Sequence, residues 1–191
     1  YTDEQKKLGI EIEDNIKLLN ATNPNIETIR KSMVPNQLCQ VKTNTSYAAD
    51  FGVFEIARVV NGLKDNGLCK EEKKLCVTLF SKTKDVTTLY YDLANMLSSV
   101  VDDIKHQSLE YKACVPTLNY IHPRNYNEII SGGVSLGYMG IVHPTVSKKI
   151  DKKASIVFLE IDMGKLGSVE NKGIHYVEAP KYPTIDVDVT F

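Results

Sequence analysis

The sequence predicts an α+β domain in which helices flank an antiparallel sheet. Apolar residues alternate with a period of two over residues 51–60, as in a half-buried strand. Over about residues 88–105 they recur every three to four positions, as in an amphipathic helix. The segments between predicted strands are hairpin-sized turns rather than regular helical crossovers, and this favours an antiparallel sheet flanked by helices over a doubly wound parallel one.

Length and composition fit one domain, 1–191, and exclude some classes of partner. A chain of 191 residues can bury a substantial core. It has 23 Lys and Arg against 24 Asp and Glu, a net charge of −1, so the whole chain has no electrostatic drive toward nucleic acid or a membrane. We find no apolar run near the roughly 18 residues of a membrane span and no signal peptide, and expect a soluble, cytoplasmic protein. Because the chain starts at Tyr1 rather than Met, we expect a fragment of a longer protein.

The first third of the chain predicts helices. Thr2 is a suitable N-cap and Gly9 a suitable stop for a short helix between them. A second helix is predicted from Asn25 to Gln40, with Pro24 in its first turn and Pro35 breaking it into a kinked pair. Its apolar positions recur at helical spacing: Ile26, Ile29, Met33, Val34, Leu38 and Val41.

The remaining elements alternate between strands and helices. A strand over 51–60 is predicted to end in a turn at Asn61-Gly62, and a second turn at 65–67 precedes a strand over 75–80. The helix over 88–105 must pack on the sheet. Further strands are predicted over 117–121, 128–131, 134–142 and 155–161, with a short helix opened by Pro144 and a last helical turn capped by Asp162.

Four glycines lie between two His-Pro dipeptides at 122–123 and 143–144. They are Gly132, Gly133, Gly137 and Gly140, and the last two interrupt an otherwise apolar run. Glycine weakens a strand unless a bulge or a close backbone approach requires it. We therefore predict that these glycines are structural and belong to a curved, buried strand that packs against another backbone.

Three patterns that could carry chemistry are weak. His122 and His143 lack a nearby third ligand, so we expect histidines bonded at strand ends and no metal site. Residues 133–137 spell a Gly-x-Ser-x-Gly elbow, but the apolar strand continues where a hydrolase needs a helix. The four cysteines contain no CxxC pair, which favours idle thiols over a disulfide or a metal site.

The densest basic cluster is formed by Lys148, Lys149, Lys152 and Lys153, with Asp151 between the two pairs. A solvated helix face explains this cluster. Contact with an RNA backbone is the open alternative, because phosphate binding needs lysines but has no sequence signature.

Five segments, taken in order, resemble one protein family. The segments are NPNIETIRKSMVP at 23–35, VFEIARVV at 53–60, YYDL at 90–93, the glycine-rich stretch at 122–144 and YPTIDVDVTF at 182–191. They are similar to successive pieces of the core domain in the beta subunit of bacterial phenylalanyl-tRNA synthetase. The last is similar to the family's link into a final tRNA-binding domain.

The resemblance implies the fold of class II aminoacyl-tRNA synthetases in a non-catalytic form. Active class II enzymes hold ATP with an arginine on one strand and a second arginine after a glycine-rich strand. Here the first strand has Phe54-Glu55 in place of Phe-Arg-x-Glu, and no arginine follows Gly140 in Ile141-Val142-His143-Pro144. We expect no catalytic residue and no cofactor in this segment, although the holoenzyme uses ATP and magnesium.

The resemblance also implies partners. The holoenzyme attaches phenylalanine to tRNA(Phe) as a heterotetramer, with the active site in the alpha subunit, so this domain would serve assembly. The helix predicted over 25–40 matches a segment where class II domains pair, which makes Arg30, Met33, Val34, Leu38 and Val41 candidate interface residues. Core packing of the same side chains is an equal alternative. The rival function is a free-standing class II paralogue that binds a small molecule or acts as an enzyme.

Overall fold

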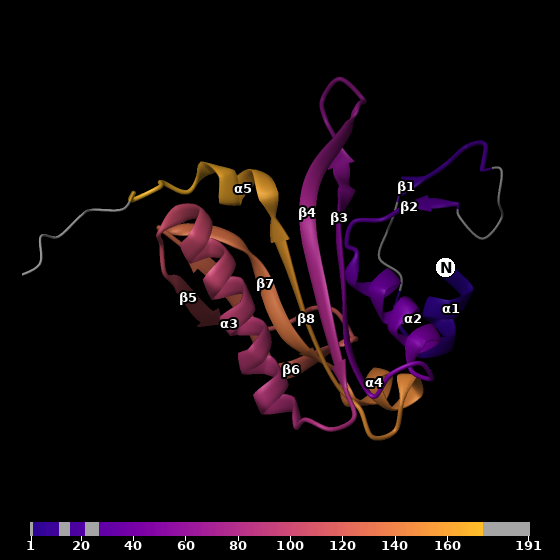
Figure 1. Ribbon diagram of the computed structural model, residues 1–191. Coiled ribbons are helices and arrows are strands. Elements are labelled where there is room, and N and C mark those ends of the chain that lie inside the picture. The colour runs from indigo at the N-terminus through magenta and orange to yellow at the C-terminus, as the bar shows by residue number, and fades with distance from the viewer. Residues whose placement is uncertain (1, 12–15, 22–26, 174–191) are drawn as a thin grey trace, which may run out of the picture.

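The computed structural model describes residues 2–11, 16–21 and 27–173 (Figure 1). Five helices and eight strands are assigned in these ranges. They are α1 (Thr2–Leu8), β1 (Ile16–Lys17), β2 (Thr28–Ile29), α2 (Val34–Asn44), β3 (Asp50–Leu63), β4 (Cys69–Ser81), α3 (Val86–Lys105), β5 (Leu109–Ala113), β6 (Ile121–Ser131), β7 (Val134–Val142), α4 (Pro144–Ile150), β8 (Ser155–Asp162) and α5 (Met163–Ser168).

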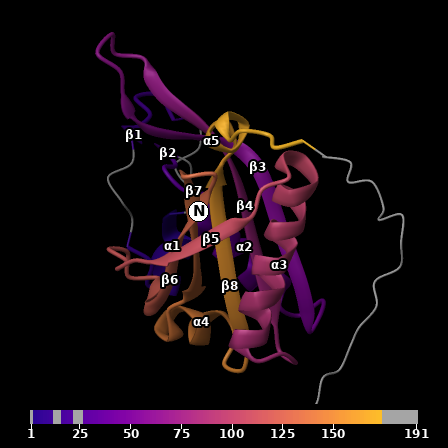
Figure 2. The same ribbon diagram turned by 90° about the vertical axis from the view of Figure 1, so that its left-hand side faces the viewer.

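Six strands form one antiparallel sheet in the order β3-β4-β8-β7-β6-β5. Helices α1, α2 and α4 lie on one face of this sheet and α3 lies on the other (Figures 1 and 2). The short strands β1 and β2 pair separately, and β2 leads to the free edge of β3, where the Val60 amide donates to the Arg30 carbonyl at 3.0 Å. The predicted antiparallel sheet flanked by helices is confirmed.

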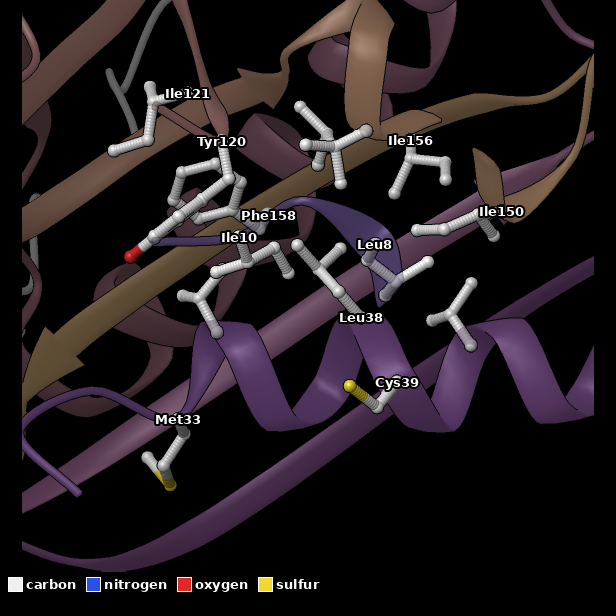
Figure 3. Close-up of a cluster of buried hydrophobic side chains, with 14 of the residues drawn as sticks. Leu8, Ile10, Met33, Leu38, Cys39, Tyr120, Ile121, Ile150, Ile156 and Phe158 are labelled. Atoms are coloured by element: carbon white, nitrogen blue, oxygen red, sulfur yellow. The ribbon is translucent and has the colours of Figure 1, made fainter. Parts of the chain in front are cut away.

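The first core layer lies between the sheet and the helices α1, α2 and α4. Figure 3 shows Leu38 of α2 beside Leu8 and Ile10, with Phe158 of β8 and Ile150 of α4 in the same cluster. Apolar side chains of the helices and of the sheet are removed from water in this layer. Their burial stabilises the fold roughly in proportion to the apolar area buried. This layer fixes α2 against strands β3, β4 and β8.

The second core layer lies beneath α3. The buried stripe of this helix, Leu89, Leu93, Leu97 and Val101, packs on β8, β4 and β7. Asp85 caps the helix by accepting from the amides of Thr87 and Thr88, and His106 ends it in the left-handed conformation. The helix predicted over 88–105 is confirmed, as are the strands over 51–60, 75–80, 134–142 and 155–161 and the helix that begins at Pro144.

The helix predicted from Asn25 to Gln40 is wrong over its first half. Thr28 and Ile29 form strand β2, and α2 begins only at Val34, with Met33 as its N-cap. Pro35 lies in the first turn of α2, where its missing N–H would have no helical partner, so it starts the helix instead of breaking it. Pro24, Asn25 and Ile26 lie outside the described residues, as does the Thr2 side chain.

One predicted turn and one predicted strand also differ, and one observed strand was not predicted. Asn61 and Gly62 continue β3 through a register shift, and the hairpin turns at 64–68 instead, where the Lys64 amide donates to the Leu68 carbonyl at 2.8 Å. Residues 117–120 are not a strand, because Asn119 exchanges hydrogen bonds with Gly9 and Glu11 and so ties this loop to α1. Strand β5 was not predicted, although Leu109, Tyr111 and Ala113 alternate with two charged residues; it is a short edge strand and mostly exposed.

Candidate functional site

Four of the five candidate interface residues are core residues of this fold. Met33, Val34, Leu38 and Val41 all belong to the first core layer, and Met33 is 0% exposed. In this fold their side chains are inaccessible to a partner, as the core-packing alternative requires. The apolar spacing that predicted them was real, but it marked the inner face of α2.

Arg30 is partly exposed and lies in the segment that joins β2 to α2. Its guanidinium forms a bidentate pair with the Glu55 carboxylate on β3. Glu160 on β8 accepts from the Met33 amide at 2.7 Å and from Ser32 Oγ at 3.1 Å. These bonds hold the chain before α2 onto strands β3 and β8.

Lys74 on β4 extends this network. Its Nζ lies 3.4 Å from Glu160 Oε2 and 3.7 Å from Glu72 Oε2. Arg58 points to the opposite face of β3 from Glu55 and pairs with Glu71 at 2.9 Å on an exposed surface. An exposed pair such as Arg58–Glu71 contributes about 0–1 kcal/mol to stability.

A buried polar contact joins α2 to β4. Gln37 Nε2 donates to the Cys76 carbonyl at 3.0 Å, and Thr78 Oγ1 donates to Gln37 Oε1 at 2.7 Å. Burial raises the pKa of the Cys39 thiol to about 11 and raises the pKa of Cys76 well above its usual range. All four cysteines are free thiols. Cys39 and Cys76 are therefore protonated packing residues at neutral pH, because the thiolate is the reactive form.

The four glycines divide into two pairs. Gly132 and Gly133 form the β6–β7 turn with φ of +54° and +76°, in the left-handed region that glycine adopts readily. Gly137 lies where a Cβ would meet the backbone of β8, 2.8 Å from Ile161 Cα. At Gly140 a Cβ would lie 3.0 Å from the Tyr126 ring and 3.2 Å from the Asn125 carbonyl.

The two histidines bond within their own turns. His122 Nδ1 accepts from the Arg124 amide at 3.2 Å, and His143 Nδ1 accepts from the Thr145 amide at 3.2 Å, which caps α4. Within the described ranges, no group of three or more His, Cys, Asp or Glu residues could hold a metal ion.

The Gly-x-Ser-x-Gly pattern does not form a nucleophile elbow. Ser135 lies near the start of β7, and the strand continues past Gly137 to Val142. The Ser135 hydroxyl donates to Glu128 Oε1 at 2.5 Å across the hairpin. A hydrolase nucleophile needs a strand-to-helix turn and a general base, and this site has a strand and a cross-strand carboxylate.

Large apolar side chains are exposed on the face of the sheet that α3 covers only in part. Val53 and Ala57 of β3 pack toward α2, so the alternating residues Phe54 and Ile56 point to the opposite face. Phe54 is 75% exposed.

Helix α3 continues this apolar surface. Its Tyr90 and Ala94 lie toward β6 and β5, since Asn127 bonds the Tyr90 hydroxyl and Tyr111 bonds the Ala94 carbonyl. The opposite flank of the helix therefore faces the side of the sheet where β4 and then β3 lie. We call the following five exposed residues the apolar strip: Phe54, Ile56, Met96, Val100 and Ile104.

The described residues thus form a packed α+β domain with two exposed surfaces, one apolar and one carrying lysines in and after α4. Residues 2–163 match the family described as the phenylalanyl tRNA synthetase beta chain CLM domain, and the chain belongs to this family. The resemblance found in the sequence is confirmed. Among the described helices, none is both long and apolar enough to span a membrane.

Curated relatives agree with this assignment. The chain is 28% identical over 210 residues to the phenylalanine–tRNA ligase beta subunit of Bacillus subtilis, covering 98% of this chain and 24% of the relative. It is 25% identical over 187 residues to the beta subunit of Syntrophus aciditrophicus, and this match covers 92% of this chain and 23% of the relative. It is 26% identical over 171 residues to the beta subunit of Chlamydia trachomatis, and this match covers 85% of this chain and 21% of the relative. The chain spans about a quarter of the length of these relatives, and such relatives do not favour a free-standing paralogue.

Proposed function

We propose that this chain is the non-catalytic, class II synthetase-like core of a phenylalanine–tRNA ligase beta subunit, and that it binds the alpha subunit. The apolar strip is the observation that carries this proposal. ATP, magnesium and the chemistry of attaching phenylalanine to tRNA(Phe) then belong to the rest of the assembly. The assembly works in the cytoplasm.

The class II assignment is supported by the six-stranded antiparallel sheet and by the position of two family segments in it. The Phe54–Arg58 segment lies on edge strand β3, and the glycine-rich segment forms β7. The site of the first ATP-binding arginine is occupied by Glu55, which holds Arg30. A carboxylate there would repel phosphates, whose transfer needs cations aimed at them.

The apolar strip supports the choice of a protein partner. Exposed apolar patches of this kind are typical of interaction sites, and interface cores favour aromatic residues and methionine over charged ones. Because Met33, Val34, Leu38 and Val41 are buried, we assign their segment a supporting role. Through Arg30 and Glu55 it holds β3, which carries Phe54 and Ile56.

Co-purification of the chain with the alpha subunit of its own source tests this assignment. The double variant Phe54→Asp and Ile56→Asp should reduce recovery of the complex at least about tenfold, because two carboxylates would have to leave water on binding. Leu63→Asp and Leu68→Asp on the exposed hairpin tip form a matched control that should assemble normally. Circular dichroism should show all variants folded. Full assembly of the Phe54/Ile56 variant would remove the strip from the interface.

A further inference from the structure

Lysines gather at one end of the molecule, where three chain segments meet. We call residues 42–50, 81–86 and 144–155 together the lysine end. These segments contain seven lysines, Lys42, Lys82, Lys84, Lys148, Lys149, Lys152 and Lys153, against three aspartates and no glutamate. The chain as a whole has a net charge of −1, so the charge of this end differs from that of the rest.

Side-chain hydrogen bonds and an ion pair hold the three segments together. Lys42 Nζ donates to the Ile150 carbonyl at 2.8 Å, and Lys82 Nζ donates to the Thr45 carbonyl at 2.9 Å. The same Lys82 Nζ lies 3.2 Å from Asp151 Oδ2. In Figure 1 this is the lower end, where α4 and the turn from β4 into α3 lie. The lysine end is therefore one surface assembled from segments far apart in sequence.

The three aspartates of the lysine end accept hydrogen bonds from groups within it. Asp50 accepts from Ser81 and Thr83, Asp85 caps α3, and Asp151 accepts from the Lys153 amide and Lys82. The side chains of Lys148, Lys149, Lys152 and Lys153 are exposed, and none forms an ion pair with another described residue. Four cations, unpaired within the described part of the chain, are thus displayed to solvent, and the lysine end as a whole carries seven lysines against three aspartates.

An aromatic ring lies in the same surface. Tyr47 is 83% exposed in the turn after α2, two residues from Thr45, whose carbonyl is bound by Lys82. No other large hydrophobic residue of the lysine end is among the exposed ones. A bilayer would need several apolar side chains to insert, and this surface offers a single ring.

We propose that the lysine end binds RNA, with Lys148, Lys149, Lys152 and Lys153 on phosphates and Tyr47 stacked on an unpaired base. Lysines neutralise phosphates without regard to sequence, and an exposed tyrosine gives any base a surface on which to stack. Folded RNA offers unpaired bases beside phosphates at its loops and ends, whereas duplex DNA keeps its bases stacked inside. The surface does not depend on binding to the alpha subunit.

Fluorescence anisotropy of the 191-residue chain with a labelled tRNA transcript tests the proposal. We expect a Kd of about 10⁻⁴–10⁻⁶ M that weakens with salt. Replacing Lys148, Lys149, Lys152 and Lys153 by Gln should weaken binding at least about tenfold and lower the salt slope by about 3, since each phosphate contact adds roughly 0.7–0.9 to it. Tyr47→Ala should weaken binding about fivefold or more and leave the slope unchanged.

The matched control removes four exposed lysines elsewhere: Lys64, Lys70, Lys73 and Lys112 to Gln. Equal weakening by this control would overturn the proposal, because it would show that binding depends only on the overall charge of the chain. Equal or tighter binding of duplex DNA would overturn the assignment to RNA. Binding of phosphatidylglycerol vesicles in preference to tRNA would assign the surface to lipid instead. The Lys-to-Gln variant should still co-purify with the alpha subunit, which separates this test from that of the proposed function.

Discussion

At the scale of single residues, Gly137 shows how backbone contact replaces a side chain. It lies on β7 opposite Ile161 of β8, and a Cβ at this position would enter the β8 backbone. Gly137→Ala should lower the free energy of unfolding by about 2 kcal/mol or more, because two strand backbones must move apart. Urea denaturation followed by circular dichroism measures this change.

Gly167→Ala in α5 is the control for this substitution. Gly167 is exposed, and nothing lies within 4 Å of its would-be Cβ. Alanine is up to about 1 kcal/mol better than glycine within a helix, so this variant should be neutral or stabilised. Equal losses in both variants would mean that the close approach at Gly137 is not what matters.

Asp50 gives a residue-scale expectation for pH. The hydroxyls of Ser81 and Thr83 donate to its carboxylate and lower its pKa below the usual value. A lowered folded-state pKa stabilises the fold above the unfolded pKa of about 3.9, and this stabilisation is lost as the pH falls through the folded value. Asp50→Asn should therefore be less stable than the wild type at pH 7, and the difference should shrink below about pH 4. Thermal melts at both pH values measure it, and a constant difference would contradict the assignment.

At the scale of elements, α2 is a core helix, and its N-cap region shows this most sharply. Met33 is 0% exposed between α2 and the sheet. Met33→Asp should therefore unfold the isolated chain, with a loss of about 3 kcal/mol or more, because the carboxylate would be buried without a partner. Thermal circular dichroism measures the loss. Gln40→Asp, exposed on the same helix, is the control and should change stability by less than about 1 kcal/mol. A folded Met33→Asp chain that fails only in assembly would return this residue to the interface.

Elements with their own periodic signal could be predicted from the sequence, and elements set by tertiary contacts could not. Helix α3 carries an apolar stripe and β3 alternates cleanly, so both were found. Residues 25–33 also have helical spacing, but Arg30 and Ser32 bond to β3 and β8, and this draws the chain into an extended course before α2. Met33, Val34, Leu38 and Val41, predicted as interface residues, lie in the core of the chain, and the sequence could not show this because apolar periodicity marks a buried face without saying what buries it.

At the scale of the whole molecule, helices pack on both faces of the sheet, but α3 covers its face only in part; the apolar strip lies on that face and the lysine end at one end of the molecule. The apolar strip runs along α3 and β3, and the lysine end lies around α4. The sequence shows the four lysines in and just after α4 but not that Lys42, Lys82 and Tyr47 join them, since only the fold brings these segments together. The apolar strip likewise depends on which flank of α3 faces β3.

The whole molecule also sets an expectation for nucleotide. Arg58 lies on an exposed face of β3 and is paired with Glu71. On the class II assignment that we propose, Glu55, which is paired with Arg30, stands at the position from which an arginine would hold ATP. The isolated chain should therefore neither bind ATP in calorimetry nor exchange pyrophosphate in the presence of phenylalanine, because cations aimed at the phosphates are needed for both. In the complex with the alpha subunit, Arg58→Ala should leave the exchange rate within about twofold of the wild type. Micromolar binding of ATP by the chain alone, or a loss of exchange beyond about tenfold in that variant, would show that this domain takes part in the chemistry and would end its assignment as a non-catalytic core.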